Sequence, residues 1–173
     1  MRLLTVVIMI LSFACGSGPD HKSESNRPGK KDMEQLNRFL VQKDRERIEN
    51  YIERKNLSMK ELDSGLWYQI LSEGEGPLYK SNDRIVFEYE CSLLDGESCY
   101  SSDQTGPREI ILGKSELETG LDQGLRLLRP GGQAIFIIPP FLAYGLKGDG
   151  KKIPARAIIV YNISTLRAVN ANK

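Results

Sequence analysis

The chain has 173 residues and a mass of 19.5 kDa, which allows one ordinary domain with extensions. Its apolar fraction of 40% is enough for a hydrophobic core, and a net charge of +1 without a long basic run argues against nucleic-acid binding. With one histidine, three scattered cysteines and no glycine-rich phosphate loop, neither a metal site nor a cofactor is expected.

Residues 1–15 are predicted to be a targeting signal. Arg2 supplies a positive charge, and the apolar run Leu3–Phe13 is shorter than the about 20 residues that a membrane-spanning helix needs. Ala14 followed by Cys15 resembles the lipobox of bacterial lipoproteins, although the leucine usual in that motif lies one place further out. The resemblance implies cleavage before Cys15 and its acylation. The alternative is an ordinary secretory signal with an incidental cysteine.

Residues 16–32 are rich in Gly, Pro and Ser and are expected to form a disordered tether. Residues 33–64 are expected to form a helical extension, in which Ser58 and Glu61 have capping-box spacing that predicts a short turn. The apolar side chains of residues 33–56 recur at helical spacing: Met33, Leu40, Val41, Ile48, Tyr51 and Ile52. This stripe is expected to pack on the following domain or to pair with a second copy as a homodimer. A marginal helix that serves only as a spacer is the remaining alternative.

A folded domain is expected over residues 65–168. Runs of alternating or β-branched residues between turn residues predict strands at 66–71, 83–93, 97–102, 108–112, 133–138 and 156–165. Asp95-Gly96 marks a tight hairpin between the second and third of these strands.

The domain is expected to contain a single clear helix. Ser115 and Glu118 have capping-box spacing at its start, and Pro130 follows its end. Gly120 and Gly124 would let the helix approach a sheet closely. The fold class is therefore α+β, with roughly five or six antiparallel strands in a curved half-barrel sheet wrapped on one short helix.

Short motifs follow one another in a fixed order along this domain. They are Val86-Phe87-Glu88-Tyr89-Glu90, Leu94-Asp95-Gly96, Ser101-Ser102, Leu112-Gly113, Pro130-Gly131-Gly132, Ala143-Tyr144-Gly145 and Ile153-Pro154. This order resembles FKBP-type peptidyl-prolyl cis/trans isomerases, and the layout with a lipoprotein signal is similar to members associated with bacterial gliding motility. The resemblance implies isomerase activity on X–Pro bonds of exported proteins.

The same resemblance implies a role for individual residues. Tyr144 would be catalytic, with its hydroxyl near a substrate carbonyl. Tyr89 and Tyr161 would be aromatic walls of a proline pocket, although ordinary sheet packing would also explain them. The other substrate-binding positions would be Leu117, the backbone N–H of Glu118, Leu121, Cys99, Tyr100 and Ile153.

Several positions depart from the family pattern. Cys99-Tyr100 stands where most active members have Phe-Asp, Leu121 where many have tryptophan, and Arg108 where an aromatic wall is usual. These changes predict a weakened pocket. Two interpretations result: a lipid-anchored isomerase acting on proline-containing segments, on the outer membrane and facing the periplasm, or a non-catalytic FKBP-like binding or chaperone module.

Cys91 and Cys99 flank the predicted hairpin. A turn with three loop residues would allow a cross-strand disulfide between them, whereas a two-residue turn would misalign them. Free, buried thiols are the alternative.

Overall fold

The computed structural model describes residues 29–168, so the predicted signal, Cys15 and residues 16–28 of the predicted tether lie outside the described part. The elements in chain order are α1 (Lys30–Lys55), β1 (Lys60–Glu61), β2 (Trp67–Ser72), β3 (Arg84–Leu93), β4 (Ser98–Ser101), α2 (Ser102–Thr105), β5 (Arg108–Ile111), α3 (Thr119–Leu125), β6 (Gln133–Ile138), the 3-10 helix η1 (Pro140–Leu142) and β7 (Ile159–Ala168).

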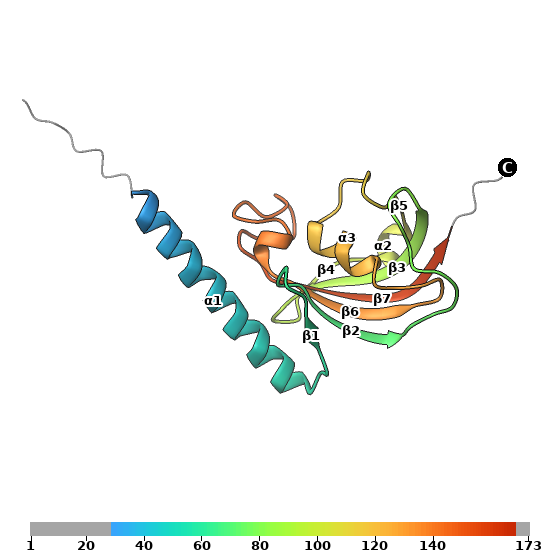
Figure 1. Cartoon of the computed structure of the whole chain (residues 1–173), viewed down its shortest axis with the longest axis horizontal. Coiled ribbons are helices and arrows are strands. Elements are labelled where there is room, and N and C mark those ends of the chain that lie inside the picture. The colour runs from blue at the N-terminus through green and yellow to red at the C-terminus, as the bar shows by residue number, and fades with distance from the viewer. Residues whose placement is uncertain (1–28, 169–173) are drawn as a thin grey trace, which may run out of the picture.

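The strands form one antiparallel, seven-stranded sheet with the order β1-β2-β6-β7-β3-β4. β5 pairs with the first half of β3, at residues 84–87, whereas β4 pairs with the second half, at residues 90–92. The sheet is curved, and α3 lies on its concave side (Figure 1). The predicted α+β class with a curved antiparallel sheet around a short helix is confirmed.

α3 approaches the sheet very closely, as its glycines predicted. A Cβ atom built on Gly120 would lie 2.4 Å from Ile138 Cγ2, and one built on Gly124 would lie 2.9 Å from three ring atoms of Phe136. Leu121 and Leu125 are fully buried on the same helix. The two glycines therefore let the helix backbone rest directly on β6.

The predicted start of this helix is wrong. Ser115 does not cap it, because the Oγ atom of Ser115 accepts a hydrogen bond of 2.8 Å from the backbone N–H of Ile111 and closes the turn after β5. The helix instead begins at Thr119, with Glu118 at the N-cap position and no side-chain cap. A second short helix, α2, was not predicted.

The capping-box pattern at residues 58–61 does not form the predicted short turn. Lys60 and Glu61 form β1 and pair with Tyr68 and Trp67 of β2. The backbone N–H of Ser58 donates to the side-chain oxygen of Gln69 at 3.1 Å. Pairing with a neighbouring strand thus overrides the local capping signal and adds a strand to the sheet.

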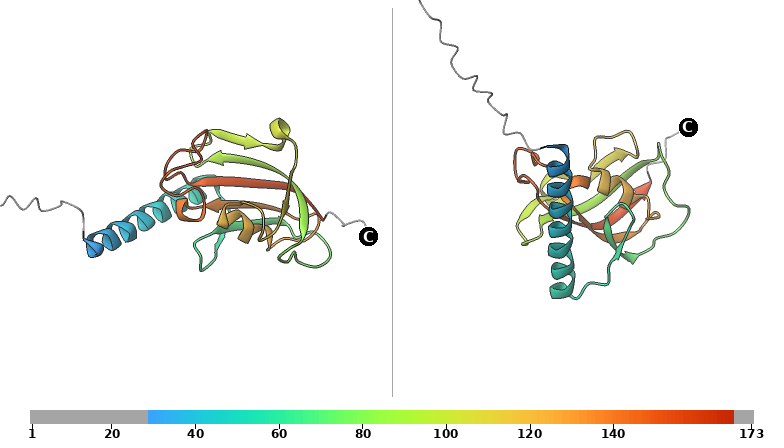
Figure 2. Two further views of the ribbon diagram at one scale, coloured as in Figure 1. Left: turned by 90° about the horizontal axis from the view of Figure 1, so that it is seen from above. Right: turned by 60° about the vertical axis from the view of Figure 1, so that its left-hand side comes forward.

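α1 begins at Lys30, within the predicted tether, and its C-terminal half docks on the domain. Ile48 is 1% exposed, and Asp44 is buried and bonded to the Arg156 guanidinium at 2.6 Å. The N-terminal half projects past the domain (Figure 2), and the side chains of Leu36 and Phe39 are about half exposed. Of the predicted stripe, Met33 is 51% exposed and Val41 38% exposed, whereas Ile48 is buried, so the domain covers only part of the stripe. No helix within residues 29–168 is long and apolar enough to cross a membrane.

The disulfide hypothesis for Cys91 and Cys99 does not fit the structure, in which both thiols are free and buried. The register places Cys91 opposite Tyr100, and a bulge follows between Cys91 and Ser92. Cys99 is therefore not the cross-strand partner of Cys91.

Candidate functional site

The predicted site residues come together between α3, the sheet and the loop after η1. Tyr89 on β3 and Tyr161 on β7 have ring centroids 5.8 Å apart at an interplanar angle of 46°. Tyr144, which follows η1, packs against the same apolar cluster from the loop side. The three tyrosines thus reach one region from three separate segments.

The floor of this region is apolar. Leu121 and Ile153 are buried members of the hydrophobic core, and Leu117 is partly buried against that core. Cys99 belongs to the same cluster, and Tyr100 packs on it. The predicted pocket residues other than Glu118 therefore lie within or against the main hydrophobic core of the domain.

The side chain of Glu118 occupies the centre of the tyrosine group. Its Oε1 atom accepts a hydrogen bond of 2.9 Å from the Tyr161 hydroxyl and a second one from the Tyr144 hydroxyl. The other oxygen, Oε2, lies 3.7 Å from Nη1 of Arg108. Among residues 29–168, this buried Oε2 has no hydrogen-bond partner. We call this arrangement of Glu118, Tyr144, Tyr161 and Arg108 the carboxylate cluster.

The two tyrosine hydroxyls remain donors because their surroundings disfavour the phenolate. Burial raises the pKa of Tyr144, and the hydrogen bond and negative charge of Glu118 raise it further. Burial is also the main cause that raises the pKa of Tyr161 well above its ordinary value, followed by the charge of Glu118. Both hydroxyls therefore keep their protons near neutral pH.

Sequence reasoning missed the side chain of Glu118 because it assigned this position only a backbone N–H. The indication in the sequence was an acidic residue between Leu117 and Leu121. In the folded chain Glu118 is only 6% exposed. The Glu118 carboxylate forms an ion pair with the guanidinium of Arg108, the residue that stands where an aromatic wall is usual in the family.

Tyr100 fastens the loop between Tyr144 and Ile153. Its hydroxyl donates to Asp149, whose other carboxylate oxygen accepts hydrogen bonds of 2.8 Å from the backbone N–H groups of Lys151 and Ile153. Burial raises the pKa of Asp149, but these hydrogen bonds outweigh it, so that the pKa is lowered. Asp149, which sequence reasoning also missed, keeps the loop folded against the cluster.

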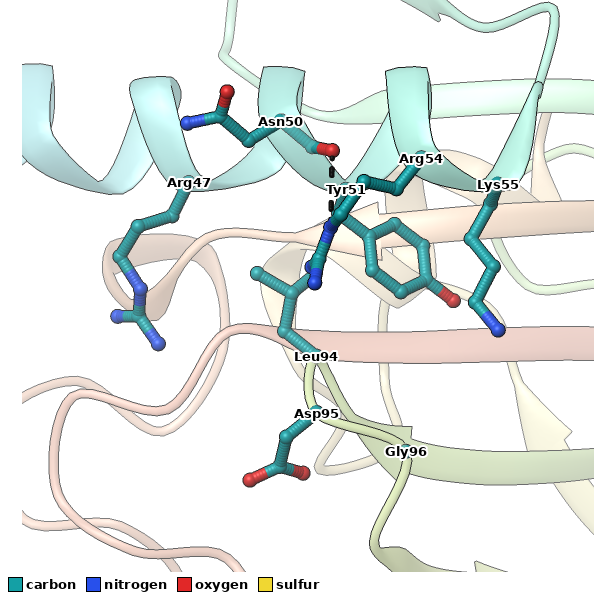
Figure 3. A pocket seen from close by; sticks show the side chains of 8 residues that line it. All are labelled: Arg47, Asn50, Tyr51, Arg54, Lys55, Leu94, Asp95 and Gly96. Atoms are coloured by element: carbon teal, nitrogen blue, oxygen red, sulfur yellow. Dashed lines mark hydrogen bonds between the residues drawn. The ribbon is translucent and has the colours of Figure 1, made fainter.

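A separate groove with a volume of about 640 Å³ lies between α1 and the turn that joins β3 to β4 (Figure 3). It is lined by Arg47, Asn50, Tyr51, Arg54, Lys55, Leu94, Asp95 and Gly96, and we call it the α1 groove. Within the described part, Arg54 and Lys55 have no acidic side chain within 4 Å, and Arg54 Nε donates to the backbone oxygen of Asn50 at 3.3 Å.

Comparison with known proteins identifies the family of the chain. A profile of the FKBP-type peptidyl-prolyl cis-trans isomerases matches residues 76–166. The probable isomerase FkpA of Neisseria meningitidis is 34% identical over 63% of this chain, and a probable isomerase of Haemophilus influenzae is 34% identical over 65%. These alignments span 40% and 46% of the relatives' lengths.

Among solved structures, FkpA from Escherichia coli superimposes with a TM-score of 0.62 and 25% identity. The match covers 84% of this chain, which is more than the domain alone, and 76% of that chain. The profile covers more than half of the sequence and includes the strands and loops that carry the tyrosines. This chain belongs to the FKBP-type peptidyl-prolyl cis-trans isomerase family.

Proposed function

We propose that the protein is a peptidyl-prolyl cis/trans isomerase acting on proline-containing segments of other proteins. The observation that carries this proposal is the grouping of three tyrosines at the apolar core: the ring of Tyr89 lies beside that of Tyr161, and the hydroxyls of Tyr161 and Tyr144 share one carboxylate oxygen. Family membership supports the same activity.

The chemistry suits a site without a nucleophile. Amide resonance gives the X–Pro bond a barrier of about 18–20 kcal/mol, and twisting the bond breaks that resonance. The twisted form is less polar at nitrogen, so an apolar pocket stabilises it relative to the planar form. In this scheme the Tyr144 hydroxyl donates to the substrate carbonyl and holds the twist.

Replacement of the Tyr144 hydroxyl tests this proposal. In the full chain with Cys15→Ser, Tyr144→Phe is expected to lower kcat/KM for a proline peptide by roughly three- to tenfold, the value of one hydrogen bond. A protease-coupled isomerase assay measures it. The matched control is Tyr79→Phe, which removes a buried hydroxyl that has no hydrogen-bond partner within residues 29–168. A folded protein without activity above background would contradict the proposal.

We also propose that the protein is exported and acylated at Cys15, that it belongs to the lipoprotein subgroup with gliding-motility-associated members, and that it assists the folding of exported proteins. The lipobox-like Ala14-Cys15 supports the anchor, and the absence of aspartate after Cys15 favours the outer membrane, facing the periplasm. Labelling with an alkyne fatty acid in a lipoprotein-processing bacterium tests it. Wild-type protein should be labelled and Cys15→Ser should not, and an unlabelled wild type would contradict the anchor.

A non-catalytic binding module is the second candidate function, and the α1 groove favours it. Arg47, Arg54 and Lys55 line the groove, in which Asp95 is the one acidic lining residue, and Arg47 also pairs with Asp44 at 3.8 Å. Partly apolar walls from Tyr51 and Leu94 would accommodate a peptide backbone. An acidic, unfolded client segment has the complementary chemistry.

Charge reversal in the α1 groove tests this second function. The Arg54→Glu, Lys55→Glu variant should weaken binding of a fluorescent Glu-rich peptide at least tenfold, as measured by anisotropy. Arg38→Glu, Lys43→Glu on the same helix is the matched control. Equal binding by both variants and by wild type would exclude the groove as the client site.

A further inference from the structure

The buried carboxylate of Glu118 is the feature that the proposed mechanism does not use. Its side chain is 3% exposed and points at the hydroxyls of Tyr144 and Tyr161. One of its oxygens accepts both hydroxyl hydrogen bonds, whereas the other faces only Arg108, at 3.7 Å.

This geometry is a poor means of stabilising the fold. A buried carboxylate with an oxygen that lacks a hydrogen bond costs free energy, and an apolar side chain of similar volume avoids that cost. Leu121, three residues further along the chain, is apolar and buried. A leucine at position 118 would continue this surface.

The carboxylate has a direct effect on Tyr144. A phenol hydroxyl has one proton to donate, and Tyr144 donates it to Glu118. The same proton cannot bond a substrate carbonyl at that moment. Hydrogen bonds to a carboxylate are roughly twice as strong as those between neutral groups, so an amide carbonyl competes at a disadvantage.

We propose that Glu118 is an internal competitor for the Tyr144 hydroxyl and that it restrains the isomerase. Glu118 is a positioning residue, since it acts through Tyr144. Arg108 forms an ion pair with Oε2 of Glu118, whereas both tyrosine hydroxyls donate to Oε1. Substrate must displace Tyr144 from Glu118 before the hydroxyl can hold the twisted bond. This inference rests on the proposed function.

A double-mutant cycle in the Cys15→Ser chain tests the proposal. Glu118→Leu should raise kcat/KM for a proline peptide about tenfold, and Glu118→Gln, a neutral and weaker acceptor, should give a smaller rise. The gain must depend on the hydroxyl, so Glu118→Leu, Tyr144→Phe should fall to the level of Tyr144→Phe alone. Glu116→Gln, at an exposed neighbouring carboxylate, should leave activity unchanged.

The outcomes separate this inference from the proposed function. If wild type is active but Glu118→Leu and Glu118→Gln are not faster, the competition is excluded. A gain that persists in the Tyr144→Phe background also overturns it, because Glu118 would then act without the hydroxyl. If no variant isomerises the peptide, the proposed function fails, and calorimetric binding of the same peptide then decides whether Glu118 competes for the Tyr144 hydroxyl. Tighter binding by Glu118→Leu, lost with Tyr144→Phe, supports it, and unchanged affinity overturns it.

Discussion

Burial makes the thiol of Cys91 unreactive. Cys91 is 1% exposed, and burial raises the pKa of its thiol from 9.0 to about 12. The thiolate is the nucleophilic form, so very little of it exists at pH 8. Burial raises the pKa of the Cys99 thiol as well.

Thiol labelling is expected to distinguish the folded from the unfolded protein. In the Cys15→Ser chain, both remaining thiols should react with Ellman's reagent only after unfolding in guanidinium at pH 8. Because folding raises the pKa of Cys91, the protonated thiol favours the folded state. Its contribution to the free energy of unfolding is fully present below pH 9 and is lost as the pH rises toward about 12. Rapid native labelling of one equivalent would contradict the buried placement of both cysteines.

At the scale of elements, the contact between α3 and β6 has no room for a side chain. Gly120→Ala would force a methyl group against Ile138, and overpacking of this kind costs about 1–3 kcal/mol. The better helix propensity of alanine returns only about 1 kcal/mol. A lower urea midpoint is therefore expected, with Thr119→Ala, at the exposed first residue of α3, as the control. A midpoint at or above that of wild type would show that the helix can move away from the sheet.

At the scale of the whole molecule, α1 presents an apolar surface that its own domain does not cover. Met33, Leu36 and Phe39 are each about half exposed. We expect this surface to pair two copies of the chain, as proposed for residues 33–56.

Sedimentation of the Cys15→Ser chain tests the pairing. The wild-type sequence should sediment as a dimer, and Leu36→Ser, Phe39→Ser should sediment as a monomer, because the paired apolar area is lost. Gln35→Ser, Arg38→Ser on adjacent positions should remain dimeric. A monomeric wild type at tens of micromolar would refute the pairing.

Much of the fold was predictable because its signals are local. The predicted strand at residues 133–138 has the observed bounds, and Gly120 and Gly124 indicated a close helix contact that the structure contains. The family motifs also indicated which tyrosines would meet. β1 was missed because its two residues are a strand only by virtue of pairing with β2.

The carboxylate cluster was not predictable for a similar reason. Whether Glu118 points to solvent or to Tyr161 depends on where the helix begins, and the capping pattern at Ser115 misplaced that start. The partners of Glu118 come from positions 108, 144 and 161, which only the folded chain brings together. The same holds for Asp149 and Tyr100.

Arg156 joins α1 to the loop that carries Tyr144. Its side chain bonds Asp44 at 2.6 Å, and its backbone N–H donates to the carbonyl oxygen of Gly145 at 2.9 Å, next to Tyr144. Arg156 also adopts a left-handed backbone with a φ of 58°, a conformation held by these contacts on both sides. We expect a shift of the helix to be transmitted to the tyrosine loop through these two contacts, and the reverse. If it is, a partner that prefers one position of α1 is expected to change the affinity of the domain for a proline ligand, and by thermodynamic reciprocity that ligand would change the affinity for the partner by the same factor.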